Sequence, residues 1–319
     1  MAKIAVALEH ALARRRALGD AGRTAPRTIA TGDGWAVADV LCTSGPRDRT
    51  FEERHALYAI AMVLAGSFQY RSPLGAGLMA PGSLMLGNPG LTYECGHEHA
   101  EGDRCVVFWY DPDYFEQLAG AGFRVPRLPP VRPLAPLLAS ACTGVLGASD
   151  IAWEELAVRL AVETAGLAAK QSAAQDTLPR NAEARVTRAV REIDRHPDAK
   201  LALGNLARES GLSPYHFLRT FERLTGVTPH QYVLRARLRD AATRLITEPR
   251  KIIDVALDSG FGDVSNFNRA FRAEFGVSPR TYRAARGSVT GLAHRSPVPS
   301  ASRWTAANNH RMVIPRSGS

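Results

Sequence analysis

The sequence predicts an α+β protein: an N-terminal antiparallel β-barrel with helices, followed by an all-α domain of two helix-turn-helix units joined by a long helix. Three observations support this prediction. Short runs rich in Val, Leu, Phe and Tyr follow one another closely between residues 35 and 115, an internal repeat with an offset of 50 occupies the C-terminal third, and the charge changes sign near residue 180. The chain has 319 residues, which is enough for two domains with separate cores.

The positive charge is concentrated in the second half of the chain. Residues 1–179 contain 16 Lys and Arg against 19 Asp and Glu, whereas residues 180–287 contain 20 against 12 and residues 288–319 contain 4 against none. A genomic preference for arginine would not leave one half acidic. Because a local basic patch indicates a polyanionic partner, we expect residues 180–287 to bind a polyanion.

The composition also argues against several classes of protein. No apolar run approaches the roughly 20 residues that a membrane span requires, so we expect no membrane partner. The arginines near the N-terminus follow a weak apolar stretch that Glu9 and His10 interrupt, which argues against a signal peptide. Four cysteines are too few for a disulfide framework and suit a reducing compartment. We therefore expect a cytoplasmic protein.

Composition and charge divide the chain into five segments. Residues 1–30 are expected to form a flexible N-terminus, residues 31–170 the β-rich domain and residues 183–287 the helical domain. Between them, residues 171–182 carry small, polar and proline residues without apolar periodicity, as a linker does. Residues 288–319 are rich in Ser, Pro and Asn and are expected to be a disordered tail.

The β-rich segment is typical of a small antiparallel barrel or sandwich, because its apolar runs are short and are broken by Gly and Pro. The expected strands lie in the runs GWAVADVLC, LYAIAMVLAGSFQYR, GSLMLGN, LTYEC and RCVVFWYD. Two helices are predicted after them, at residues 134–146 and 151–170. In the second helix Ile151, Leu156 and Leu160 share one apolar side.

The helical segment contains two copies of one motif. At an offset of 50 the same residue recurs in seven pairs: Phe217 and Phe267, Arg219 and Arg269, Phe221 and Phe271, Gly226 and Gly276, Val227 and Val277, Pro229 and Pro279, Tyr232 and Tyr282. Each copy is predicted to be a short helix, a glycine turn and a second helix. Between the copies, residues 229–247 are predicted to form one helix, roughly 28 Å long at 1.5 Å per residue. This length is close to the roughly 34 Å between successive major-groove faces of B-DNA.

The second helix of each copy has clear start signals. Gly211 tolerates the left-handed conformation that ends the preceding helix, and Ser213 and Pro214 provide an N-cap and a first helical residue. Asp263 is the expected cap in the second copy. The phenylalanines of both helices recur every three or four residues and are expected to face inward.

The inward-facing phenylalanines leave polar residues on the other sides of these helices. In the second copy they include Asn266, Asn268 and Arg269. Arg and Asn are the residue types that pair with guanine and adenine edges in the major groove. The alternative for Arg219 and Arg269 is a phosphate contact, because half or more of the contacts in such interfaces go to the DNA backbone.

The stretches ALGNLARESGLSPYHFLRTFERLTGVTPHQYV and IIDVALDSGFGDVSNFNRAFRAEFGVSPRTYR resemble the double helix-turn-helix domain of the AraC/XylS family of bacterial transcription regulators. The resemblance covers about residues 185–285. The base-facing positions that it implies are Tyr215, Leu218 and Arg219 in the first unit and Ser265, Asn266, Asn268 and Arg269 in the second. Leu218 departs from the family pattern, in which a polar residue is common, although it can still contact a thymine methyl group.

The resemblance extends more weakly to the first half of the chain. The stretches LAGSFQYRS and MAPGSLMLGNPG resemble the cupin-like sensor domain of many AraC-type regulators. Residues 31–170 are then expected to be a cupin-like sensor and dimerisation domain. In the family, helices such as those at 134–146 and 151–170 often pair two subunits into a homodimer, and the alternative is that they pack on the barrel. The implied partners are promoter DNA, a small-molecule or metal effector and RNA polymerase, and the implied location is the nucleoid.

A cluster of candidate metal ligands lies in residues 95–105, which read CGHEHAEGDRC. Cys95, His97, His99 and Cys105 are suitable ligands for zinc or another soft-to-borderline metal. A catalytic cupin has Glu three or four residues after an H-x-H motif, whereas Glu101 follows after one residue, so the enzymatic pattern is broken. Two other interpretations stay open, a reversible disulfide between Cys95 and Cys105 and a polar loop without a ligand.

These observations predict a sequence-specific DNA-binding transcription regulator rather than an enzyme. In this hypothesis the front domain binds a signal molecule and changes how the two helix-turn-helix units bind a promoter. Regulators of the family that the sequence resembles are most commonly activators. One alternative is an alkylation-repair-like protein in which a metal-bound cysteine accepts a methyl group, and another is a redox or metal sensor. A third is an architectural DNA binder with a silent front domain.

Overall fold

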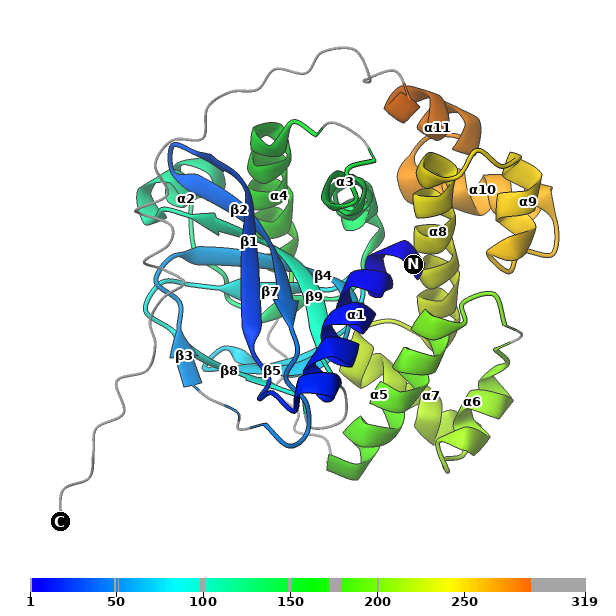
Figure 1. Ribbon diagram of the computed structural model, residues 1–319, viewed down its shortest axis with the longest axis horizontal. Helices are drawn as coiled ribbons and strands as arrows, with labels where there is room; N and C mark the ends of the chain where they lie inside the picture. The colour runs from blue at the N-terminus through cyan, green and yellow to red at the C-terminus, as the bar shows by residue number, and fades with distance from the viewer. Residues whose placement is uncertain are drawn as a thin grey trace.

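The computed structural model describes residues 2–48, 50, 52–97, 101–148, 151–171, 180–199 and 201–287. Its N-terminal part contains two antiparallel sheets and its C-terminal part is entirely helical (Figure 1). The predicted tail at residues 288–319 and most of the predicted linker lie outside the described residues. The linker is shorter than expected at its C-terminal end, because helix α5 already begins at Arg180.

The strands form two sheets, and every strand pair is antiparallel. The six-stranded sheet has the order β1 (Thr24–Gly32), β2 (Trp35–Cys42), β9 (Asp103–Tyr110), β4 (Tyr58–Gly66), β7 (Leu84–Gly87) and β10 (Arg127–Leu128). The four-stranded sheet has the order β3 (Glu52–Arg54), β8 (Thr92–Gly96), β5 (Phe68–Ser72) and β6 (Gly75–Met79).

The two sheets pack face to face as an open sandwich. Their inner faces share a core in which Val63, Cys105 and Val107 of the six-stranded sheet meet Phe68 and Tyr70 of the four-stranded sheet. Within the described residues, no ladder of hydrogen bonds joins an edge of one sheet to an edge of the other. The predicted cupin-like barrel is therefore not confirmed, and these strands form the sandwich that the strand pattern also allowed. Alternation of apolar residues predicts which face of a strand is buried, but closure depends on whether the edge strands pair.

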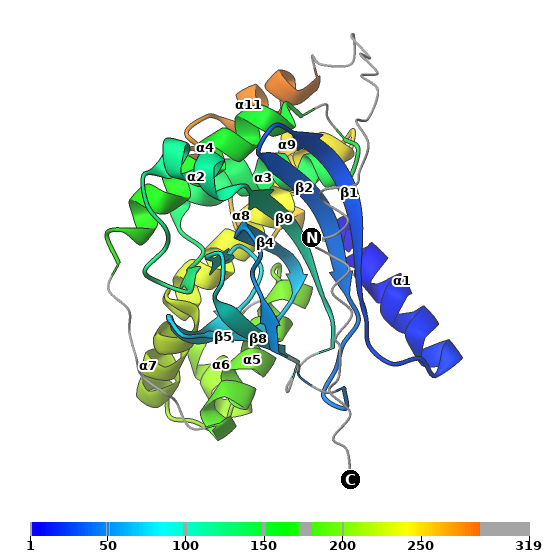
Figure 2. The same ribbon diagram turned by 90° about the vertical axis from the view of Figure 1, so that its left-hand side faces the viewer.

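Helices cover the outer face of the six-stranded sheet. They are α1 (Ala2–Leu18), α2 (Pro112–Ala119), α3 (Ala135–Val145), which follows the short 3-10 helix η1 (Arg132–Leu134), and α4 (Trp153–Ala168). Figure 2 shows α1 beside β1 and β2, with α2, α3 and α4 grouped together. The predicted helices at 134–146 and 151–170 are thus confirmed, with slightly different ends.

The prediction of a flexible N-terminus at residues 1–30 is wrong for the described residues. Ile4, Leu8 and Leu12 recur every four residues, are almost fully buried and belong to the main core of the front domain. They pack α1 against strands that include β4 and β2. The buried face of α1 consists of a single row of apolar residues. The arginines that follow this row make its periodicity hard to recognise in the sequence.

Helix α4 packs on the sandwich, as one of the two interpretations of the sequence predicted. Leu156 and Leu160 are buried in the same core as the outer face of the six-stranded sheet. The hydroxyl of Tyr110 in β9 donates a hydrogen bond to the carbonyl of Ala157 in α4 at 2.9 Å. The apolar side of α4 is therefore used within one subunit, and a homodimer stays a prediction.

The C-terminal part is built around one long helix. It consists of α5 (Arg180–Arg195), α6 (Leu203–Glu209), α7 (Pro214–Thr225), α8 (Pro229–Thr247), α9 (Ile252–Asp258), α10 (Val264–Phe275) and α11 (Pro279–Gly287). The 19 residues of α8 confirm the predicted connector. In Figure 1, α8 lies between the unit formed by α6 and α7 and the unit formed by α9 and α10.

The front domain contacts both helix-turn-helix units. Leu78 of β6 is buried in the core of the first unit, and Ala139 of α3 is buried in the core of the second. Between these contacts, Arg235 of α8 donates a hydrogen bond to the carbonyl of Pro130 at 2.6 Å. We call residues 127–139, which include β10, η1 and the start of α3, the bridging segment. None of the described helices is long and apolar enough to cross a membrane.

The buried side chain of His55 makes the stability of the front domain depend on pH. The ring of His55 lies against Gly87, where any side chain would overlap it, and its Nε2 is 3.0 Å from the Tyr70 hydroxyl. That hydroxyl donates to the Leu86 carbonyl, so the network assigns the His55 proton to Nε2. Burial disfavours the charged imidazole and lowers the pKa of His55 to about 4.

We expect the front domain to lose stability as the pH falls from 6.5 to 4. Over this range His55 binds a proton in the unfolded chain but not in the folded one, which costs about 3 kcal/mol of unfolding free energy near pH 4. His55→Gln should remove this loss, and the exposed His230→Gln is the matched control. Urea unfolding followed at pH 7 and pH 4 measures the difference. Equal acid sensitivity of wild type and His55→Gln would contradict the assignment.

Candidate nucleic-acid interface

The start of α7 is fixed by its own sequence. Gly211 adopts a φ of 63° in the turn after α6, and Pro214 occupies the first turn of α7. The Ser213 hydroxyl accepts a hydrogen bond from the His216 backbone N–H at 3.3 Å. The predicted cap is therefore confirmed, and it holds the N-terminal half of α7 in a defined direction.

Helix α7 exposes two of its three predicted base-facing residues. Phe217 and Phe221 are fully buried, whereas Tyr215 is 63% exposed and Arg219 is exposed. The Arg219 guanidinium donates to the Tyr215 hydroxyl at 3.2 Å and lies 5.9 Å from the centre of the Tyr215 ring. Tyr215 therefore orients Arg219 on the surface. Leu218 is half-buried at the edge of this surface.

Helix α10 presents a more polar surface. Its cap Asp263 accepts a hydrogen bond from the Asn266 backbone N–H at 2.6 Å, as predicted from the sequence. The predicted residues Ser265, Asn266, Asn268 and Arg269 are all exposed. The Arg269 guanidinium donates to the Asn266 side-chain oxygen at 3.4 Å. Arg219 and Arg269 are thus each held by a neighbour one turn earlier in the same helix.

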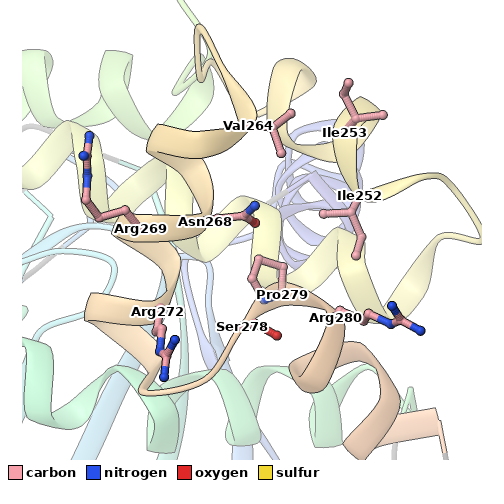
Figure 3. A pocket seen from close by; sticks show the side chains of 9 residues that line it. All are labelled: Ile252, Ile253, Val264, Asn268, Arg269, Arg272, Ser278, Pro279 and Arg280. Atoms are coloured by element: carbon pink, nitrogen blue, oxygen red, sulfur yellow. The ribbon is translucent and has the colours of Figure 1, made fainter.

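A hollow of about 560 Å³ lies beside α10 (Figure 3). It is lined by Ile252, Ile253, Val264, Asn268, Arg269, Arg272, Ser278, Pro279 and Arg280. In Figure 3, Arg269 and Arg272 extend on one side of the hollow and Arg280 on the other. Cationic side chains around an open hollow suit an anion of the size of a phosphate group.

Arg272 and Arg280 are not among the residues predicted from the sequence. Arg272 lies three residues beyond Arg269, outside the predicted base-facing positions of α10, and Arg280 lies on the next helix. The spacing of Arg269 and Arg272 was a usable signal, because residues three apart share one face of a helix. The contribution of Arg280 depends on how α11 folds back beside α10 and was not visible in the sequence.

The two units differ in charge at equivalent positions. At the offset of 50, the second unit has Arg272 and Arg280 where the first has Glu222 and His230, and all four side chains are exposed. The second unit also has Asn268 where the first has Leu218. In the opposite sense, the exposed Arg223 of the first unit has Ala273 at the equivalent position, so the two units carry their cations at different positions.

The candidate metal ligands are distributed differently from the prediction. Cys95 lies in β8, His97 directly after it and Cys105 in β9, whereas His99 lies outside the described residues. The structure also brings His97 together with Cys42 and Asp103, neither of which was predicted as a ligand. These two residues are 61 positions apart and meet only because β2 pairs with β9. No local spacing could have indicated this pair.

The Cys105 thiol is buried between the sheets. Cys105 is 4% exposed and donates to the Asp103 carboxylate at 3.2 Å. Burial and the nearby carboxylate raise the pKa of Cys105 well above its usual value, so the thiol stays protonated. Without a metal ion, the Cys105 thiol is therefore a poor nucleophile.

The imidazole at this site is charged in the absence of a ligand. Burial opposes the charge on His97, but hydrogen bonds to Asp103 and Cys42 outweigh it and raise the pKa of His97 to about 10. The bond between His97 Nε2 and Asp103 Oδ1 is 2.8 Å long. His97 and Asp103 therefore form a buried ion pair between the sheets.

Comparison with known proteins places similarity in the helical part of the chain. A family model described as a helix-turn-helix domain matches residues 206–285. The chain is 38% identical over 91 residues to the regulatory protein SoxS of Salmonella typhimurium, a match that covers 28% of this chain and 85% of SoxS. It is 34% identical over 84 residues to the HTH-type transcriptional activator AarP of Providencia stuartii, covering 26% of this chain and 62% of AarP.

Among solved structures, the DNA-binding domain of AdpA in complex with a target DNA covers 34% of this chain and 98% of that chain, with 28% identity and a TM-score of 0.33. These four matches each include between about a quarter and a third of this chain.

Proposed function

The chain belongs to the AraC/XylS family of DNA-binding transcription regulators, and from this premise we propose that it reads two successive major-groove faces of one promoter with α7 and α10. One observation carries the proposal: two capped helices with exposed polar faces sit at the two ends of one continuous helix. The 19 residues of α8 span about 28 Å, close to the roughly 34 Å between successive major-groove faces.

The exposed residue types support different roles for the two helices. In the second unit, Arg269 matches the acceptor pair of guanine, and Asn266 and Asn268 match the donor and acceptor of adenine. In the first unit, Arg219 is the corresponding reader, and Leu218 suits a thymine methyl group. The hydrogen bond to Tyr215 restricts the Arg219 side chain before DNA binds. Arg219 therefore loses less conformational entropy on binding, which favours it as a residue that contacts a base.

Arg269→Ala should weaken binding to the cognate site by about 1 to 3 kcal/mol, because a bidentate contact with guanine is lost. Binding to a scrambled duplex should change much less. The cognate site is found by selection from a random duplex library and footprinting, and fluorescence anisotropy then gives both affinities. An equal loss on both duplexes would show that Arg269 contacts phosphate rather than a base.

Arg272→Ala and Arg280→Ala should each weaken binding on every sequence and reduce the slope of log K against log salt by about 1, because each removes one phosphate contact. The matched variant in the first unit is Glu222→Ala, which should strengthen binding because it removes a negative charge from the interface. Affinities measured between 50 and 200 mM salt test both expectations. An unchanged slope in both variants would show that the arginines around the hollow do not contact DNA phosphates.

We also propose that a small-molecule or metal effector of the front domain acts through the bridging segment. Its Pro129 lies against Gly226, the C-cap of α7, where a Cβ atom would approach the Pro129 Cβ to 2.6 Å. At the end of α10, Glu274 pairs with Arg132 at 3.7 Å and with Arg235 at 3.5 Å. Since the bridging segment contacts both recognition helices, its displacement changes the placement of both units at once.

Gly226→Ala tests this coupling, and Gly276→Ala is its matched control. Both glycines cap a recognition helix with a φ near 77°, so either substitution should cost about 1 kcal/mol of unfolding free energy. Only Gly226 has the bridging segment beside it, whereas no atom lies within 4 Å of a Cβ at Gly276.

Gly226→Ala should therefore speed amide hydrogen exchange in residues 127–139 and change DNA affinity by more than Gly276→Ala does. Indistinguishable exchange in the two variants would disprove the coupling.

On promoters, we propose that the chain acts as an activator that contacts RNA polymerase. The name of the relative AarP, a transcriptional activator, supports this direction. A reporter fused to the selected site, measured with and without the gene for this chain, gives the sign of regulation.

A further inference from the structure

Five metal-ligating side chains meet at one end of the sandwich, between the two sheets. Cys42 and Asp103 are opposite each other in the pairing of β2 with β9, so they share one face of the six-stranded sheet. Cys105 lies two residues beyond Asp103 and has the same face. Cys95 and the residue after β8, His97, face them from the four-stranded sheet, next to Tyr70 and Phe68.

Three of these side chains place their possible ligand atoms close to the separations found in a metal site. The Cys42 sulfur, one nitrogen of His97 and one oxygen of Asp103 all lie within 4.8 Å of one another. In a tetrahedral zinc site the ligand atoms are about 3.3 to 3.8 Å apart, as follows from bonds of about 2.0 to 2.3 Å. Shifts of about 1 Å or less would therefore bring the three atoms to bonding distance.

A fourth ligand lies next to this group. The Cys105 thiol is 3.2 Å from Asp103 Oδ2, the oxygen that does not bond His97. The side chains of His97 and Asp103 are only 3% and 8% exposed, so water does not compete freely for the site. The set of two sulfurs, one nitrogen and one oxygen suits zinc and similar borderline metals and does not suit Mg²⁺ or Ca²⁺.

We propose that Cys42, His97, Asp103 and Cys105 bind one divalent metal ion of the zinc class. The ion would replace the proton shared by His97 and Asp103 and the protons of the two thiols. Three of its ligands come from the six-stranded sheet and one follows β8 of the four-stranded sheet, so the ion joins the two sheets at their open end. This site is independent of the proposed DNA contacts and goes beyond the proposed function.

Cobalt titration of the reduced, chelator-treated full-length chain tests the proposal. Wild type should bind one Co²⁺ and show thiolate-to-cobalt charge transfer and tetrahedral ligand-field bands, and Zn²⁺ should displace both. Cys42→Ser and Cys105→Ser should each lose about half of the charge-transfer intensity. Each should also lose about 100-fold or more in Co²⁺ affinity, since even loss of an outer hydrogen-bond partner costs 10- to 100-fold.

Cys95→Ser is the matched control inside the sandwich, and Cys142→Ser is the control for a buried thiol elsewhere in the front domain. Both should bind Co²⁺ like wild type. Circular dichroism and binding to the selected DNA site identify any variant that fails to fold. Absence of Co²⁺ and Zn²⁺ binding by folded wild type at about 10 µM metal would overturn the proposal. A loss in Cys95→Ser as large as that in Cys42→Ser would overturn the ligand set.

Discussion

The burial of aromatic side chains against α8 is the interaction on which the helical half of the molecule depends. Neither helix-turn-helix unit is large enough to enclose its own phenylalanines, and α8 supplies the missing side of both cores. Its N-terminal half provides Tyr232 and Ala236 to the first core, and its C-terminal half provides Leu238, Ala241 and Leu245 to the second. Because α8 is one continuous helix, the separation and relative rotation of the two units follow from the positions of these residues along it.

The same helix also holds neighbouring segments through half-buried arginines. Arg237 donates to the carbonyls of Pro197 and Ala199 at 2.7 and 2.9 Å, and Arg235 donates to Pro130 in the bridging segment. Guanidinium groups suit this task because several donors can satisfy separate carbonyls at the end of a long stem. Several arginines of the sequence are therefore structural, whereas exposed arginines such as Arg219, Arg269, Arg272 and Arg280 are available to a polyanion. Net charge alone indicated the partner but not the residues.

Local signals in the sequence were sufficient for the helical half and insufficient for the front domain. Caps such as Ser213 and Asp263, the glycine turns and the length of α8 are set by neighbouring residues, so they could be predicted. The helical position of Ile4, Leu8 and Leu12 and the open edges of the sandwich depend on contacts distant in sequence. The meeting of Cys42 with Asp103 depends on the register of two strands that lie 60 residues apart, which no single-sequence pattern encodes.

The two units are attached to the front domain in different ways. The first unit shares its core with Leu78, a full apolar side chain that is 1% exposed. The second receives the small side chains of Ala135 and Ala139, together with a contact to an arginine that is 61% exposed. The sandwich therefore buries a larger apolar side chain in the first unit than in the second. Because the front domain buries the larger side chain in the first unit, a movement of β6 displaces the first unit more directly than the second.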